Sequence, residues 1–195
     1  LMVIGGISTV TAATYTVTKT ADTNDGVCDA ADCSLREAIT AANAANTDDS
    51  IEFEPTVFAG TQTVTLTLGE LVVANNGSLT INGTGANRLS ISGNDQSRVF
   101  QVAAGANLTL NGLTVTNGRV SGEGAQGGGI YTQGGNVTLN NCAVTNNSLI
   151  TSGGHGAGIF SLGFNAGSAV VINNSTISDN YINGQGSGGG IYSAG

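Results

Sequence analysis

Four short segments of one pattern recur along this chain at nearly constant intervals, and this repeat limits its folds more than any other feature. They align without gaps, 29, 29 and 33 residues apart, as Leu79-Thr-Ile-Asn-Gly83, Leu108-Thr-Leu-Asn-Gly112, Val137-Thr-Leu-Asn-Asn141 and Val170-Val-Ile-Asn-Asn174. A second alternating run follows each of them, at 89–92, 113–116, 142–145 and 175–178. A third run contains the pairs Val99-Phe100, Ile130-Tyr131, Ile159-Phe160 and Ile191-Tyr192.

Three alternating runs of about four residues per repeat predict three short strands per repeat. Sandwich strands are longer and pair in hairpins, whereas three short strands close one coil of a solenoid whose coils stack about 4.8 Å apart. We therefore expect an all-β fold, a parallel β-helix over residues 51–195 that is cut off within a coil. The extra residues of the longer coils, at 118–128 and 151–157, are expected to form Gly-rich loops.

One Asn recurs where the first run bends into the second: Asn82, Asn111, Asn140 and Asn173. Bends that need positive φ favour Asn and Gly, and stacked coils would join these amides in a ladder. In the second run, Cys142 shares the column of Leu113 and Ser175 and is expected to be a small buried apolar side chain rather than a reactive thiol.

The first 50 residues follow another pattern. Residues 1–13 are apolar and then small, like the remnant of a secretory signal peptide. In an exported protein, Cys28 and Cys33 are expected to form a disulfide. Ser34 and Glu37 have the spacing of a capping box. Apolar residues at helical spacing follow, so we expect a helix at about 34–46 within an N-terminal cap of residues 14–50.

The segment Cys33-Ser-Leu-Arg-Glu-Ala38 resembles the signature of the bacterial CSLREA N-terminal domains. The Gly-Gly-Gly-Ile-Tyr segments at 127–131 and 188–192, and Asn-Ser-Thr-Ile-Ser at 174–178, look like the β-helix repeats that follow that domain. The resemblance covers residues 14–195, and the long segment 161–169 departs from the tight repeat. It implies a right-handed parallel β-helix in a secreted or cell-surface protein and carries over no catalytic residue.

Charge is low and uneven. Only 9% of the residues are charged, against about 25% in ordinary globular domains, and the formal net charge is -8. Because phosphate binding needs clustered Lys and Arg, no nucleic-acid partner is expected. Most of the acidic residues lie in the first 54 residues. Among them, Asp22, Asn24 and Asp25 resemble a calcium loop, but the EF-hand spacing fails, so an acidic turn closed by the disulfide without metal is favoured.

Two strings resemble motifs of polysaccharide-cleaving β-helix enzymes: Asn46-Thr-Asp48-Asp49 and Gly154-His-Gly156. Glycosidases need two carboxyl groups within about 5–9.5 Å, whereas these strings lie more than three coils apart. Asp95 with Arg98 is the one close pair of opposite charges in the body, expected as a loop ion pair. No catalytic residue is assigned, and convergence of any two of Glu70, Asp95, Glu123, His155 and Asp179 in a groove would reverse this.

The aromatic residues of the third run, Phe100, Tyr131, Phe160 and Tyr192, are expected to form one column. An inward-facing core stack is favoured. Facing outward, Tyr131, Phe160 and Tyr192 would instead be a strip on which sugar rings stack. A threonine array with Thr114, Thr116, Thr145 and Thr176 is a weaker candidate for an ice-binding face.

The expected function is therefore a non-catalytic structural or adhesive β-helix module, secreted or at a bacterial cell surface. Extracellular glycans or a host or neighbouring cell surface are the candidate partners, with no cofactor and no membrane span. The alternatives are a carbohydrate-active enzyme, a lyase or hydrolase, and a glycan-binding module.

Overall fold

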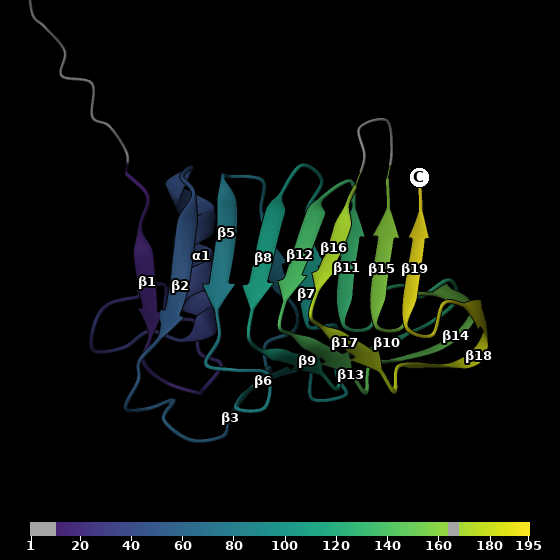
Figure 1. Ribbon diagram of the computed structural model, residues 1–195, viewed down its shortest axis with the longest axis horizontal. Helices are drawn as coiled ribbons and strands as arrows, with labels where there is room; N and C mark the ends of the chain where they lie inside the picture. The colour runs from purple at the N-terminus through teal and green to yellow at the C-terminus, as the bar shows by residue number, and fades with distance from the viewer. Residues whose placement is uncertain (1–10, 164–167) are drawn as a thin grey trace, which may run out of the picture.

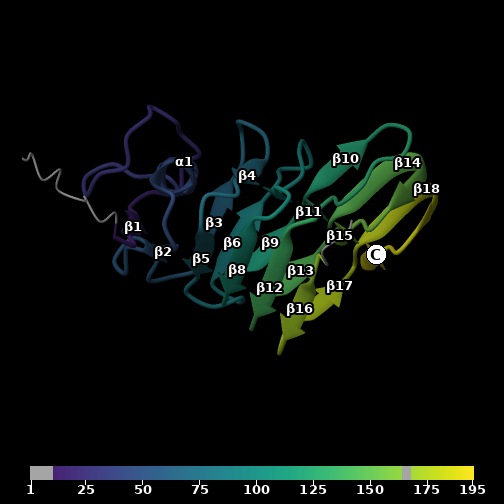
Figure 2. The ribbon, with the colours of Figure 1, turned by 90° about the horizontal axis from the view of Figure 1, so that it is seen from above.

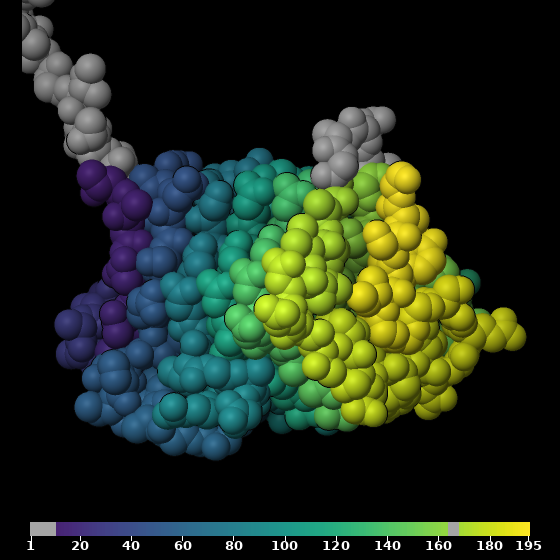
Figure 3. Space-filling model, viewed as in Figure 1, coloured from purple at the N-terminus to yellow at the C-terminus, as the bar shows by residue number. Residues whose placement is uncertain are grey.

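The structure, a computed structural model, describes residues 11–163 and 168–195 and is built almost entirely of parallel strands. Five coils wind in a right-handed sense along the long axis, and each strand pairs in parallel with its equivalent in the next coil (Figures 1 and 2). In the space-filling view the coils follow one another in sequence order along that axis (Figure 3). The predicted parallel β-helix is confirmed; most of the predicted signal remnant, 1–13, lies outside the described residues.

The strands form four parallel sheets. Sheet A contains β1 (Thr14–Val17), β2 (Asp49–Phe53), β5 (Ser78–Asn82), β8 (Asn107–Asn111), β12 (Asn136–Asn140) and β16 (Val170–Asn173). Sheet B contains β3 (Gln62–Thr65), β6 (Leu89–Ser92), β9 (Thr114–Thr116), β13 (Ala143–Thr145) and β17 (Thr176–Ser178). Sheet C contains β4 (Leu71–Val73), β7 (Phe100–Val102), β11 (Ile130–Gln133), β15 (Ile159–Leu162) and β19 (Ile191–Ala194). Sheet D contains β10 (Arg119–Ser121), β14 (Ser148–His155) and β18 (Tyr181–Ser187).

Each coil visits sheet A, then B, then C, and we number the coils 1 to 5 from β2, β5, β8, β12 and β16. Alternate side chains of each strand point into the coil, so equivalent apolar residues stack along the axis. Ile81, Leu110 and Leu139 form one such fully buried column in sheet A. Burying side chains of this size stabilises the fold by about 1.5–3 kcal/mol each.

The predicted asparagine ladder is present along the end of sheet A. The Nδ2 of Asn111 donates to Oδ1 of Asn82 at 2.6 Å, Asn140 donates to Asn111 at 2.8 Å, and Asn173 donates to Asn140 at 2.8 Å. The expected positive φ is wrong for these four residues, which are strand residues; it falls one position later, at Gly112, Asn141 and Asn174. The ladder residues hold the coils together, and the next residue makes the bend.

The expectation of three strands per coil, with Gly-rich loops at 118–128 and 151–157, was wrong for the later coils, because strands of sheet D lie there. Coils 3 to 5 each have a fourth strand between sheets B and C, and these strands build a side lobe. The lobe has a small core of its own, in which Leu149 packs with Ala125 and Ala157. Glycine is needed where the chain leaves and re-enters the coil, because a Cβ on Gly118 would lie 2.0 Å from the carbonyl oxygen of Gly128.

Cys142 is a free, buried cysteine in the main core, in register with Leu113 and Ser175 as predicted. Burial raises the pKa of its thiol, outweighing hydrogen bonds from backbone amides that favour the thiolate. This environment suits an apolar packing residue, because a raised pKa lowers the fraction of nucleophilic thiolate.

The helix α1 (Leu35–Ala45) covers the first coil at the N-terminal end (Figure 2). The predicted capping box is present: the Ser34 hydroxyl accepts the Glu37 amide at 3.1 Å, and the Glu37 carboxylate accepts the Ser34 amide at 2.7 Å. Asn46 ends the helix in the left-handed conformation. Strand β1 of the same segment pairs with β2, so the cap also adds a strand to sheet A.

Strand β4 lies at the edge of sheet C and, among the described residues, has no strand on its N-terminal side. A side chain of the cap takes the place of that strand. Nδ2 of Asn43 donates to the carbonyl oxygen of Val72 at 2.8 Å, and the amide of Ala74 donates to Oδ1 of Asn43 at 2.9 Å. One carboxamide thus makes both bonds that a neighbouring residue would make. An exposed edge invites pairing with other chains, and here it is closed by the helix.

Arg36 extends this closure to the corner before β4. Its guanidinium binds both carboxylate oxygens of Asp22, at 2.7 and 3.0 Å, and donates to the carbonyl oxygens of residues 69 and 70. Burial raises the pKa of Asp22, but hydrogen bonds from Arg36 and from the amides of residues 67 and 68 outweigh it, and the pKa lies below its usual range. The pair joins the cap to the first coil.

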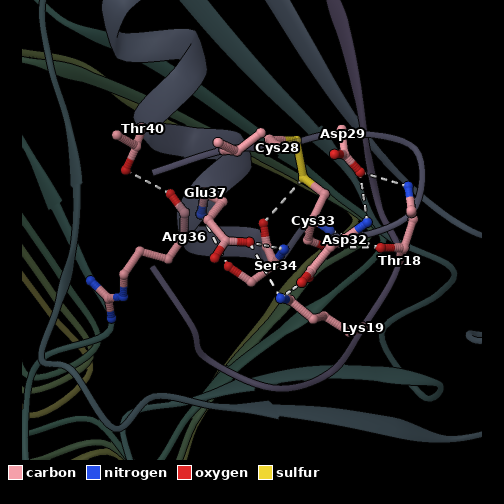
Figure 4. The surroundings of a disulfide bond; sticks show 12 residues. Thr18, Lys19, Cys28, Asp29, Asp32, Cys33, Ser34, Arg36, Glu37 and Thr40 are labelled. Atoms are coloured by element: carbon pink, nitrogen blue, oxygen red, sulfur yellow. Dashed lines mark hydrogen bonds and ion pairs between the residues drawn. A yellow bond between two sulfur atoms is a disulfide. The ribbon is translucent and has the colours of Figure 1, made fainter. Parts of the chain in front are cut away.

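The predicted disulfide links Cys28 and Cys33 immediately before α1 (Figure 4). Around it, the Asp29 carboxylate accepts the backbone amides of Ala31 and Asp32, and Lys19 forms an ion pair with Asp32. The disulfide therefore closes a turn that is also held by hydrogen bonds and an ion pair of neighbouring side chains.

Candidate functional site

The aromatic residues of sheet C form a column, although not the predicted one. Tyr131 pairs with Phe160, and Phe160 with Tyr192, whereas the residue in register with Tyr131 in coil 2 is Gln101. Phe100 instead aligns with Ile130, so its place in the column was wrong by one residue. Length differences in the corner loop hide this shift in the sequence.

The column lies on the face of sheet C opposite the main core. Ile130 and Ile159 point inward and are fully buried, so the favoured inward orientation was wrong for Tyr131, Phe160 and Tyr192. It is confirmed for Phe100, which lies in the main core. The rings of Tyr131 and Phe160 stack with their centroids 5.3 Å apart, and those of Phe160 and Tyr192 are 5.5 Å apart. Phe160 is only 1% exposed between its neighbours, so its ring faces are already in contact with protein.

Residues of the neighbouring corner contact the stack, and Arg98 lies over the face of the Tyr131 ring that is turned away from Phe160. The Arg98 guanidinium lies 4.8 Å from the centroid of the Tyr131 ring, and the His155 ring lies 4.4 Å from that of Tyr192. Arg98 also binds the carbonyl oxygens of residues 126 and 127 and pairs with Glu70. The predicted Asp95–Arg98 pair is therefore replaced by a partner from the preceding coil.

Next to Tyr131, the outer face of sheet C is hollowed over coils 2 and 3. The depression has a volume of about 540 Å³ and is lined by Gln101, Val102, Ala103, Ala104, Tyr131, Gln133 and Gly134. Its floor is made of small side chains, and the Tyr131 hydroxyl donates to Oε1 of Gln133 at 2.6 Å at its rim. None of the lining residues is charged.

The candidate calcium residues have other partners. Asp22 is committed to Arg36, and Asp25 accepts the amide of Val27 in a local turn. Among the described residues, no hydrogen bond joins the Asn24 side chain to Asp22 or Asp25. Within residues 11–163 and 168–195, no three His, Cys, Asp or Glu side chains are grouped so that they could hold a metal ion.

The two enzyme-like strings lie far apart. Asp48 accepts the amide of Ser78, and Asp49 is buried in β2, where it accepts the amide of Ala13. His155 ends β14 in coil 4, three coil steps or roughly 14 Å further along the axis.

Glu70 and His155, two of the five residues whose convergence would indicate catalysis, have separate partners. Glu70 binds Arg98, and His155 stacks on Tyr192. The depression beside Tyr131 contains none of the five, and a smaller one beside Arg119 contains Asp95 alone. The threonine array also fails as an exposed face, because Thr114 and Thr116 are buried.

Sequence reasoning found Tyr131 but missed Gln101, Gln133 and the role of Arg98. The alternation within β11 places Gln133 on the same face as Tyr131, which the sequence could have shown. To place Gln101 beside Tyr131, the correct register between coils 2 and 3 would have been required. The link from Arg98 to Glu70 spans 28 residues and follows only from coil stacking.

In comparisons with family models, with curated proteins and with solved structures, the chain matches none. The described part of the chain has no helix with the length and apolarity to cross a membrane.

Proposed function

We propose that this chain is a non-catalytic structural or adhesive β-solenoid module of a secreted or cell-surface protein. The observation that carries the proposal is the placement of several ionisable side chains, which are used in structural contacts. Asp22 and Arg36 close the first coil, Glu37 completes the capping box, and Glu70 anchors Arg98. Acid–base cleavage of a glycan needs carboxyl groups that face each other across a substrate.

Export is supported by two features of the N-terminal region. The Cys28–Cys33 disulfide belongs to oxidising compartments, and the apolar start of the chain has the composition of a signal segment. Membership of the bacterial CSLREA family is part of the same proposal: residues 33–38 supply one cysteine of the disulfide, the capping box and the first turn of α1. The signature thus has a mechanical role in starting the solenoid.

The experiment incubates the purified chain with a panel of polysaccharides and follows both reducing ends and unsaturated products. In parallel, fluorescently labelled chain is tested for retention on bacterial and host cell surfaces. We expect retention without product formation. Turnover that scales with protein concentration and survives repeated purification would refute a non-catalytic role. Absence of both retention and turnover would limit the module to a spacer role.

A glycan-binding role is the second candidate, favoured by one specific observation. The depression on the outer face of sheet C combines an aromatic residue with two carboxamides, the mixture of apolar and hydrogen-bonding groups typical of ligand sites.

A further inference from the structure

We infer that the depression on coils 2 and 3 of sheet C binds an uncharged polysaccharide chain. The inference rests on the proposed function, because it names the ligand class of the adhesive surface. It also replaces the stacking strip predicted from the sequence. Phe160 cannot offer a ring face to a sugar, since both of its faces are stacked on tyrosines.

The size and floor of the depression fit a ligand of this kind. Its volume of about 540 Å³ lies within the range of about 300–1,000 Å³ of small-molecule sites. The hollow exists because coil 2 carries Ala103 where coil 3 carries Gln133, and because Ala104 lies beside Gly134. The depression is open to solvent, so a chain longer than the hollow can extend beyond it.

The lining matches hydroxyl groups rather than charges. A carboxamide offers both donors and an acceptor, as a sugar hydroxyl group does. Because Oε1 of Gln133 accepts the Tyr131 hydroxyl, its amide nitrogen is the group that this side chain offers to a ligand. Gln101 adds a second carboxamide at the same wall, and the edge of the Tyr131 ring, whose two faces lie against Phe160 and Arg98, adds a small apolar surface.

The absence of basic side chains in the lining favours neutral glycans over acidic ones. Binding of carboxylates or sulfates favours Arg or Lys, and no basic side chain lines the depression. The nearest basic group, Arg98, is neutralised by Glu70 and held by backbone carbonyl oxygens. The net charge of -8 disfavours a polyanion further.

The test is affinity electrophoresis of the full chain through gels that contain soluble neutral polysaccharides (a mixed-linkage β-glucan, a xyloglucan and a galactomannan) or polygalacturonate. Titration calorimetry with the retained glycan gives the dissociation constant. Two variants address the site: Gln133→Ala removes the donor, and Ala104→Gln fills the hollow at an exposed position. Thr138→Ala is the matched control, because this threonine lies on a strand of sheet A in coil 4.

We expect retention by at least one neutral glycan and none by polygalacturonate. Each site variant should weaken binding by about tenfold or more, the effect of one lost hydrogen bond or of steric exclusion, whereas the control stays within about twofold. Unchanged melting curves show that the variants are folded.

Three results would overturn the inference, and they bear differently on the proposed function. Neutral glycan binding that both site variants retain would place the site elsewhere and leave adhesion standing. Retention by polygalacturonate alone, or by cells but by none of the neutral glycans, would refute the ligand class and also leave adhesion standing. Cleavage of the retained glycan would refute the non-catalytic function itself.

Discussion

The N-terminal cap and the coils of this solenoid solve the same problem by opposite means. Both must satisfy the backbone groups at the edge of a parallel strand. The coils do so by repetition: each strand is covered by its equivalent, and asparagine side chains repeat the pattern in a ladder. In sheet A the cap adds strand β1, but beside β4 and the corner before it the cap uses side chains of Asp22, Arg36 and Asn43 in place of a strand.

The difference explains the uneven charge. A repeated column cannot contain a charged residue in every coil, because like charges would then lie about 4.8 Å apart along the axis. Uncharged Asn avoids this, since each amide is both donor and acceptor. The cap is used once, so it can employ a charged pair. Ionisable residues therefore gather where the repeat begins.

The largest effect is expected from breaking the charged pair of the cap. Arg36→Ala leaves the Asp22 carboxylate buried without its partner and removes two bonds to the first coil, which should cost about 3–5 kcal/mol. Urea unfolding followed by circular dichroism gives the change, and hydrogen exchange should show β4 opening first. Arg88→Ala, at an exposed position, is the control and should cost less than about 1 kcal/mol. Equal losses in the two variants would contradict a special role for the cap.

Removal of the disulfide should have the next largest effect. Its loop is short, so the Cys28→Ser/Cys33→Ser variant should lose about 2 kcal/mol of unfolding free energy. The same loss should appear when the wild-type chain is reduced with dithiothreitol before thermal melting. A Cys142→Ala chain should still respond to the reductant, since Cys142 is free. No response in either chain would show that the turn is held without the disulfide.

The coil side of the comparison is tested in the asparagine ladder. Asn140→Ala removes a residue that donates to Asn111 and accepts from Asn173, and should cost about 1–2 kcal/mol. Asn173→Ala removes one bond at an exposed position and should cost less than half as much. Chemical denaturation of the two variants side by side decides this. If the end residue costs as much as the central one, the ladder is not the stabilising unit.

The last prediction concerns the response of the cap to acid. Burial raises the pKa of Glu37, but hydrogen bonds from the Ser34 and Asp25 amides and from the Thr23 and Ser34 hydroxyls outweigh it and hold the pKa at about 2, below the ordinary 4.5. The native state thus binds fewer protons at this group than the unfolded chain. Its stabilisation is present above about pH 4.5 and is lost as the pH falls towards 2. Melting temperatures of the wild type between pH 6 and 2 should fall more steeply than those of Glu37→Gln.

The parts of this fold that were predictable are those that repeat or that depend on near neighbours. The ladder residue Asn140 and the buried Cys142 follow from the period, and the Ser34–Glu37 capping box from a spacing of three. Sheet D was missed because its strands, rich in Gly and polar residues, lack clear alternation. They are held by a separate small core around Leu149.

The candidate site shows the same limit. Tyr131 was found from the repeat, but its orientation depends on which residue of the pair at 130–131 faces the main core, and both are apolar enough to do so. Gln101 was hidden by a one-residue shift, and the partner of Arg98 lies one coil away. Contacts between coils are fixed by stacking, which single-sequence patterns describe only where the coils are equal in length.

The equal spacing in the central ladder has a consequence for how such a chain can change. Asn111 and Asn140 are 29 residues apart, and so are Asn82 and Asn111. Insertion or deletion of a complete unit of that length would rejoin every column in register, whereas a change of one residue would break all of them at once. Evolution and design can therefore alter the length of the molecule in whole coils, while its ends and its outer surface stay the same.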